Sequence, residues 1–410
     1  MFSFEWADSS LRRPLTVLDP LPLLLLCYVH AILVIVPVTR LARAALLPFT
    51  LYCAWYGGTH FDFARTLAPL GEMLGYEPVR LNYMNFMFAI ICIGLACRAI
   101  EWTIVPGPYR RFDRPVGDAP PVERPLTPKY VLLDAFELCM NLRGIGWSTT
   151  RNKFPEPVSP PLFKLYAQLN WHWICVDFGL YICQHLQPSL NIPTGASISD
   201  PSRSPVGSIL VPCTLTAVSG IIIFRGIEVM GEVGALISRL FMGLEDWQWP
   251  NLFNSPWRAT SIADFWGRWH QLFRRFFIVL GSRPAGKLGK LLAGKPGERA
   301  FGVLGAFGIS ALLHALGTWA MGRGYEFWPM GGFFVMQGVG AVLEEASPVK
   351  PSGFGGWLWT MGWTIAWGTQ MVDAWARRGL FASDFVPQWA RPSVFLLERV
   401  PAVLVSLRTS

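Results

Sequence analysis

Charged residues are scarce in this chain of 410 residues, of which only 15% are Asp, Glu, Lys or Arg. A soluble globular domain usually has about a quarter of its residues charged. Hydrophobic residues make up 52% of the chain and aromatic residues 14%. This composition excludes an ordinary soluble domain and predicts an all-α, polytopic integral membrane protein.

Several catalytic motifs are absent, and each absence excludes a class of chemistry. The chain has no nucleophile elbow, no His-Glu-x-x-His, no phosphate-binding Walker loop and no Asp-rich pair for magnesium diphosphate. It also lacks the His-x-x-x-Asp used by soluble coenzyme-A acyltransferases. The eight cysteines are scattered without a Cys-x-x-Cys or a Cys/His metal spacing. We therefore expect reduced, packed thiols and no metal site.

Apolar stretches approach the ~20 residues that a transmembrane helix needs. The stronger stretches are residues 18–38, 83–105, 162–183, 208–224, 301–320 and 355–371, and the weaker ones are 42–55, 229–242, 330–343 and 394–407. Residues 229–242 are either a continuation of the preceding helix or a re-entrant helix. There is no internal repeat and no Ser/Gly-rich linker, so we expect one membrane domain over residues 1–410 with about eight transmembrane helices.

The whole chain has a net charge of +8, and two segments are rich in Arg or Lys: residues 106–161, where acids are mixed in, and residues 268–299. Between Arg268 and Arg299 lie eight Lys and Arg residues against one acid, Glu298. The positive-inside rule places this segment on the cytosolic side of a membrane. We expect a lipid bilayer as a partner, and no nucleic acid.

Residues 261–281 predict an amphipathic helix. Ser261 followed by Asp264 forms a capping box, and Gly281 is a plausible stop. Apolar side chains share one stripe, while Asp264 and Arg268 lie opposite and can pair. His270 lies at the edge of the apolar stripe. The helix either rests on anionic lipid through tryptophans and arginines, or lines a cytosolic funnel that binds phosphates.

One histidine, His314, interrupts the otherwise uncharged segment 301–320. An ionisable side chain at membrane depth is costly, and it is a functional-site candidate by default. Small residues recur every four positions before it, at Gly302, Ala306 and Ser310. Such a ledge lets helices approach closely, so His314 is predicted to face the protein interior. It either packs helices together or acts as a base, because a neutral imidazole has a nitrogen that can accept a proton.

The tract Ser261-Ile-Ala-Asp-Phe-Trp-Gly-Arg-Trp-His270, followed by an intramembrane histidine, resembles the membrane-bound O-acyltransferase family. Its wax-synthase-like branch, which includes fungal terpenoid and meroterpenoid O-acetyltransferases, is the most similar. Residues 141–147, Asn-Leu-Arg-Gly-Ile-Gly-Trp, also resemble a fungal segment of this branch and extend the likeness over approximately 135–380. Plant members have a tract one residue longer that ends in Asn where this chain has His270.

The resemblance implies that acyl-coenzyme A, with acetyl-CoA as first choice, is a co-substrate and that no cofactor is bound permanently. His314 would be the base, and His270 would orient the acyl carbonyl or stabilise its oxyanion. The side chains that would hold the donor are Trp266, Arg268, Trp269, Arg274, Arg275, Lys287 and Lys290. The acceptor would be a small hydrophobic alcohol, and the compartment the endoplasmic reticulum.

Other readings of the sequence stay open. The nearest alternative is a wax ester synthase that uses long-chain acyl-CoA. A different class is a non-enzymatic membrane carrier or scaffold whose histidines only pack helices. A haem protein is a more distant alternative, suggested by the spacing of His172 and His185 on one apolar helix.

Overall fold

The structure is a computed structural model, and it describes residues 11–114, 120–150, 154, 160–322 and 324–401. Helices dominate the described part of the chain. The first half contains α1 (Leu21–Ile35), α2 (Arg40–His60), α3 (Phe63–Met73), η2 (Pro78–Leu81), α4 (Tyr83–Ile104), α5 (Pro128–Met140), α6 (Leu162–Leu186) and η3 (Pro188–Asn191). The second half contains α7 (Gly207–Phe241), η4 (Asp246–Gln248), η5 (Pro256–Arg258), α8 (Ile262–Arg268), α9 (Arg274–Phe276), η6 (Phe277–Ser282), α10 (Arg283–Trp319), α11 (Phe327–Ala346), α12 (Gly353–Ala376), η7 (Leu380–Ala382), η8 (Gln388–Ala390), α13 (Pro392–Val394) and η9 (Phe395–Arg399).

Strands are confined to two short pairs within the described residues. β1 (Arg13–Pro14) pairs in parallel with β2 (Phe61–Asp62), and β3 (Phe112–Asp113) pairs antiparallel with β4 (Val122–Glu123). Each strand has only two residues, so the pairs tie loops together and form no sheet of their own. The predicted all-α class is therefore confirmed for the described chain.

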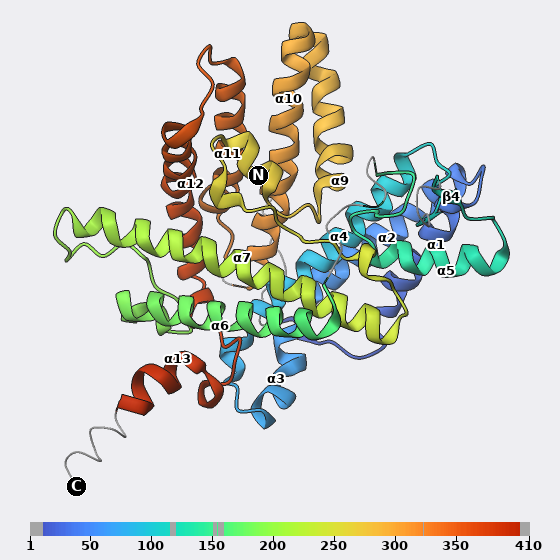
Figure 1. Cartoon of the computed structure of the whole chain (residues 1–410). Helices are drawn as coiled ribbons and strands as arrows, with labels where there is room; N and C mark the ends of the chain where they lie inside the picture. Colours follow the sequence, from blue (N-terminus) through green and yellow to red (C-terminus); the bar gives the residue numbers. More distant parts are fainter. Residues whose placement is uncertain (1–10, 115–119, 151–153, 155–159, 323, 402–410) are drawn as a thin grey trace.

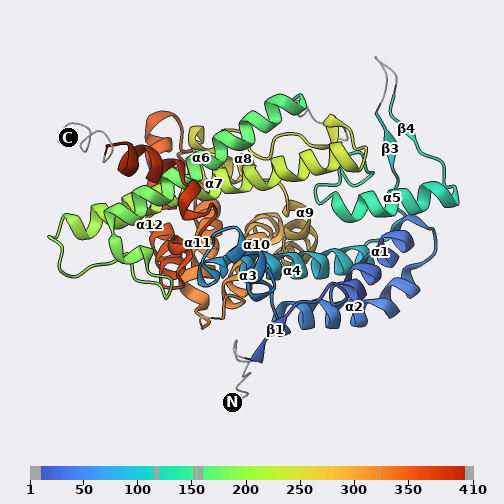
Figure 2. The same ribbon diagram turned by 90° about the horizontal axis from the view of Figure 1, so that it is seen from below.

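Three groups of helices meet at the centre of the molecule. Helices α10, α11 and α12 stand side by side, and α6 and α7 lie across them as a packed pair (Figure 1). Helices α1, α2, α4 and α5 form the third group, which joins the first through contacts between α4 and α10 (Figure 2). The largest buried apolar cluster lies between α6, α7, α10, α11 and α12. This cluster surrounds the cavity that holds the candidate site.

Three helices of the described chain are long and apolar enough to cross a membrane: Pro78–Ile104, Gly207–Phe241 and Arg274–Trp319. Leu21–Ile35 is a shorter apolar helix. The stretches expected at 208–224 and 229–242 form one helix, α7, so the second continues the first. The total of about eight spans is not confirmed and stays a prediction. One of the weaker candidates, 394–407, extends into residues 402–410, which are outside those described.

The lysine-rich segment after residue 281 forms a helical hairpin. A break at Ala293 and Gly294 divides α10 into two antiparallel arms, and the first arm continues η6 without interruption. Gly281 does not end a helix as expected. It lies against the backbone of Gly305 on the second arm, where a Cβ atom would overlap the Gly305 carbonyl. Gly289 meets Gly297 in the same way, so glycines let the two arms pack backbone against backbone.

Candidate active site

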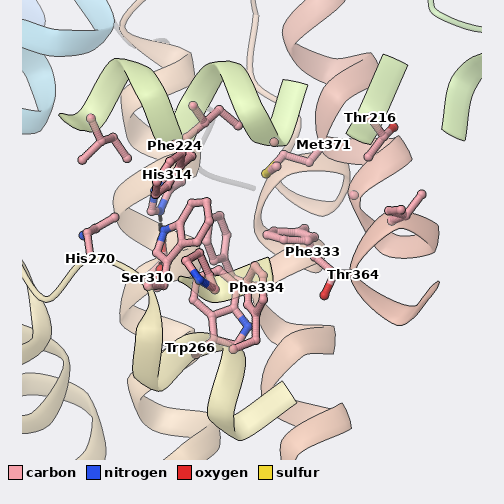
Figure 3. A pocket seen from close by; sticks show the side chains of 18 of the residues that line it. Thr216, Phe224, Trp266, His270, Ser310, His314, Phe333, Phe334, Thr364 and Met371 are labelled. Atoms are coloured by element: carbon pink, nitrogen blue, oxygen red, sulfur yellow. Dashed lines mark hydrogen bonds between the residues drawn. The ribbon is translucent and has the colours of Figure 1, made fainter. Parts of the chain in front are cut away.

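A cavity of about 380 Å³ lies between α7, α8, α10, α11 and α12. Aromatic and aliphatic side chains make up most of its lining, and both predicted catalytic histidines belong to that lining. Figure 3 shows His270 and His314 toward one side of the cavity and Thr216 and Thr364 toward the other. The two histidines therefore lie together at one side of a mainly apolar cavity.

His314 is held by a hydrogen bond within its own helix. Its Nδ1 lies 2.8 Å from the carbonyl oxygen of Ser310. A carbonyl oxygen only accepts, so Nδ1 carries the proton and Nε2 of a neutral ring has a free lone pair. The ring also stacks on Phe334, with centroids 4.1 Å apart and an interplanar angle of 22°. These two contacts fix both the tautomer and the ring plane.

The small-residue ledge before His314 faces the protein, as the spacing predicts. Gly302 packs against Ser282 on the first arm of the hairpin. Ala306 and Ser310 line the cavity together with His314. The ledge thus serves two purposes: its first residue lets the two arms approach, and the later ones border the cavity.

His270 lies outside any helix, in contrast to the expected continuous helix over 261–281. Helix α8 ends at Arg268, and Trp269 is extended, with φ −68° and ψ 165°. The backbone amide of Asn254 donates to the Arg268 carbonyl at 2.9 Å. The Gln271 side-chain amide donates to the Trp269 carbonyl at 2.7 Å. These bonds satisfy carbonyls that an uninterrupted helix would have used, so the chain turns and brings His270 to the cavity.

The His270 ring is surrounded by aromatic edges. Phe253 and Phe273 lie at 5.8 and 6.0 Å between centroids, both nearly perpendicular to the imidazole. Its Nδ1 is buried and has no hydrogen-bond partner among the described residues. Burial, followed by the charges of His314 and Arg143, lowers the pKa of His270 to about 3. The imidazole is therefore neutral near pH 7 and has one N–H to donate.

The N-terminus of α8 contains one predicted and one unexpected cap. The Ser261 hydroxyl accepts from the Asp264 amide at 3.0 Å, and Asp264 pairs with Arg268 at 2.8 Å, as the sequence predicts. The buried carboxylate of Glu344 also accepts from the amides of Ile262 at 2.7 Å and Ala263 at 3.2 Å. The only sequence signal for Glu344 is an acid just after the apolar run 330–343, and it was missed.

The predicted donor-binding side chains divide into two sets. Trp266, Trp269 and Arg274 line the cavity with the two histidines, and Arg274 has no ion pair among the described residues. Arg268 and Arg275 are held elsewhere: Arg268 pairs with Asp264, and Arg275 pairs with Glu101 and donates to the hydroxyl of Tyr109. Lys287 and Lys290 are exposed on the first arm of the hairpin, where Lys290 lies 3.7 Å from Glu298.

The two histidines of α6 that suggested a haem site lie apart from the cavity histidines, and only His172 is buried against a carboxylate. His172 Nδ1 lies 3.0 Å from the carboxylate of Glu232, and His185 lies at the other end of the same helix. No group of three or more His, Cys, Asp or Glu side chains within the described ranges could hold a metal ion. The eight cysteines are free thiols.

Comparison with known proteins matches residues 249–336 to the family described as "Membrane bound O-acyl transferase family". The matched segment contains α8, both histidines and the glycine-packed hairpin. The resemblance predicted from the tract around His270 and from His314 is thus confirmed over this part of the chain.

Three relatives are similar over longer stretches. A long-chain-alcohol O-fatty-acyltransferase of Simmondsia chinensis is 30% identical over 32% of this chain and 36% of its own length. An O-mevalon transferase of Aspergillus niger is 25% identical over 55% of this chain and 53% of its own. An acetyltransferase of Arthrobotrys oligospora is 25% identical over 58% of each. The chain therefore matches between 36% and 58% of the length of these relatives.

The Glu344 cap should be required for the stability of the site. Glu344→Ala leaves the Ile262 and Ala263 amides and the Trp359 indole N–H, which donates to the same carboxylate at 2.8 Å, without their acceptor. Each unpaired buried donor costs about 1–3 kcal/mol, so we expect a clear fall in Tm measured by fluorescence-detected thermal unfolding. Glu345→Ala is the matched control, because Glu345 is exposed and makes only a 3.4 Å surface pair with Arg299. Equal Tm values for the two variants would contradict the assignment.

Proposed function

We propose that this chain transfers an acyl group from acyl-coenzyme A to a hydroxyl of a hydrophobic acceptor. The observation that carries the proposal is the arrangement of His314, with a free Nε2, and a neutral His270 on one apolar cavity. The likeness to membrane-bound O-acyltransferases and the activities for which the three relatives are named support the same class of reaction.

The reaction would proceed by direct attack in a ternary complex. His314 Nε2 accepts the proton of the acceptor hydroxyl, and the oxygen attacks the thioester carbonyl. His270 donates its N–H to the carbonyl oxygen as negative charge develops there. When the tetrahedral intermediate collapses, the C–S bond breaks and the leaving thiolate takes the proton from His314. An ester and free coenzyme A result, with no covalent enzyme intermediate.

The electrostatics of the cavity suit these two substrates. Its apolar lining, which includes Met371, Val372 and Ile365, can hold a hydrophobic acceptor that enters from the bilayer. Arg274 is exposed and borders the same cavity, so it can pair with a phosphate of coenzyme A. Trp266 and Trp269 line the same cavity, so their rings can shield the thioester from water.

Within this reaction class, we favour acetyl transfer from acetyl-CoA to a terpenoid or meroterpenoid alcohol in fungal secondary metabolism, in the endoplasmic reticulum. Two features support this choice: the fungal-type segment 141–147 and the similarity to the Arthrobotrys acetyltransferase. A long-chain wax ester synthase is the alternative, supported by the Simmondsia relative. We keep a single membrane domain over residues 1–410 as part of the proposal.

The test of the activity uses microsomes that contain the full chain. They are supplied with labelled acetyl-CoA or palmitoyl-CoA and a panel of terpenoid and long-chain alcohols, and esters and free coenzyme A are measured by mass spectrometry. Ester formation with stoichiometric release of free coenzyme A is expected. If no pair of donor and acceptor yields more ester or free coenzyme A than microsomes that lack the chain, the carrier or scaffold alternative is favoured.

His314→Ala should reduce kcat by about a hundredfold or more, the usual contribution of a general base. Alanine suits the small-residue ledge, so the yield of folded protein should be unchanged. His185→Ala is the control, because His185 is half exposed at the far end of α6 and does not line the cavity. A His314→Ala enzyme with near wild-type kcat would refute the proposed mechanism.

Arg274→Ala should raise KM for the acyl-CoA roughly two- to fivefold with little change in kcat, since an exposed ion pair contributes up to ~1 kcal/mol to both ground and transition states. High salt should imitate the variant because exposed charges are screened within ~8–10 Å. The pair Lys287→Ala and Lys290→Ala tests the remaining predicted phosphate contacts in the same assay. A rise confined to the KM for the acceptor would show that Arg274 binds the acceptor and not the acyl-CoA.

His270→Asn should keep substantial activity, because the Asn amide can donate a hydrogen bond from a side chain of similar reach. His270→Ala should lose roughly ten- to a thousandfold in kcat, as oxyanion donors do. Both variants are compared with His314→Ala at matched folded protein. If Asn is as inactive as Ala, then His270 is the proton acceptor and His314 only packs helices.

A further inference from the structure

The loop at 141–147 has a well-defined conformation, and Arg143 extends from it. Gly144 and Gly146 have φ of +68° and +78°, which side chains with a Cβ rarely adopt. The Asn141 side chain closes the loop, accepting from the Ile145 amide at 3.1 Å and donating to the Ile145 carbonyl at 2.8 Å. Trp147 anchors the loop to α5, donating to Glu137 at 2.6 Å. The Arg143 side chain extends from this loop toward residues 250–251.

Arg143 reaches a segment more than a hundred residues further along the chain. Its Nη1 donates to the carbonyl of Pro250 at 2.8 Å and to that of Asn251 at 3.3 Å. Burial lowers the pKa of Arg143 to about 10, so it remains charged near pH 7. No carboxylate of the described residues lies within ion-pair distance of it. Glu228, which lies beyond ion-pair distance, partly offsets the effect of burial by raising the pKa of Arg143, so the two carbonyls are the direct contacts that fix the guanidinium.

The segment that Arg143 contacts, residues 250–251, leads directly to the cavity. Two residues after Asn251, the buried Phe253 places its ring edge-on against Trp269 at 4.9 Å and against His270 at 5.8 Å between centroids. The next amide, that of Asn254, donates to the Arg268 carbonyl at the point where α8 ends. His270 has no hydrogen bond at Nδ1 within the described chain, so ring contacts and this backbone turn set its orientation.

We propose that Arg143 is a positioning residue, which clamps the carbonyls of Pro250 and Asn251 so that Phe253 holds the His270 ring in its place in the cavity. Its charge also acts on His270, which is consistent with the two groups lying near each other. This inference rests on the proposed acyl transfer for its effect on rate, but the position of the His270 ring can be measured without any activity.

The variants are Arg143→Met and Arg143→Lys in the full chain. Met keeps the length of the side chain without a donor, whereas Lys keeps a charged donor that can reach a carbonyl. Phe253→Leu removes the aromatic contact with His270 and leaves Arg143 unchanged. Arg239→Met is the matched control, because Arg239 likewise donates to a backbone carbonyl, that of Pro160 at 2.7 Å, and lies about three turns of α7 beyond the cavity lining.

The first readout is the rate at which diethylpyrocarbonate modifies His270 at pH 7, measured peptide by peptide with His185 as internal reference. We expect Arg143→Met and Phe253→Leu to raise the His270 rate about threefold or more through local loosening, with Arg143→Lys close to wild type and Arg239→Met unchanged. Thermal unfolding verifies that each variant is folded. An unchanged His270 rate in both Arg143→Met and Phe253→Leu would overturn the proposal.

The second readout is the kinetics of acyl transfer per folded protein. Arg143→Met should lower kcat roughly ten- to a hundredfold with KM for acyl-CoA little changed, because small displacements of a reacting group have effects of this size. Arg143→Lys should recover most of the lost kcat. A rise in KM for acyl-CoA alone, with normal His270 labelling, would make Arg143 a donor ligand and overturn the positioning role. Altered labelling in a chain without any acyl transfer would instead refute the proposed function alone.

Discussion

The close contact between the two arms of the α10 hairpin is the constraint on which the site depends. Gly281 lies against Gly305, and Gly289 against Gly297, at positions where a Cβ atom would overlap the opposite backbone. Because the arms touch, the start of the first arm and the middle of the second border one space. Arg274 and Phe277 from one arm thus line the same cavity as Ser310 and His314 from the other.

The two histidines are positioned by different kinds of contact. His314 is fixed locally, by a carbonyl one turn earlier on its own helix and by the stacked ring of Phe334. His270 is fixed by distant parts of the chain, through the turn after α8 and the aromatic ring of Phe253. A general base needs a defined tautomer, and the helical hydrogen bond supplies it. An oxyanion donor needs a defined position relative to the base, which only tertiary contacts can set.

Charge in this protein is used sparingly and mostly in pairs. Arg275 and Glu101 join α9 to α4 through a largely buried ion pair, with Tyr109 as a third partner. The Glu344 carboxylate is bound by three N–H groups from α8 and α12. Arg274 and Arg143 have no ion-pair partner among the described residues, as is also true of the buried Arg12 and Arg43, which donate to backbone carbonyls. Arg274 and Arg143 differ from these two in lying close to the proposed chemistry.

The sequence by itself determined the helical class, the ledge leading to His314 and the cap at Ser261, because these depend on local periodicity and on residues three or four positions apart. It also singled out the two histidines. Only the tertiary structure decided that the helix breaks at Trp269, since the bonds from Asn254 and Gln271 outweigh an amphipathic pattern that favours continuation. Periodicity likewise could not separate Arg274 from Arg275, which are adjacent in the chain but face the cavity and Glu101, respectively. The hairpin and the role of Glu344 depend on contacts between distant segments, and such contacts leave no local pattern in the sequence.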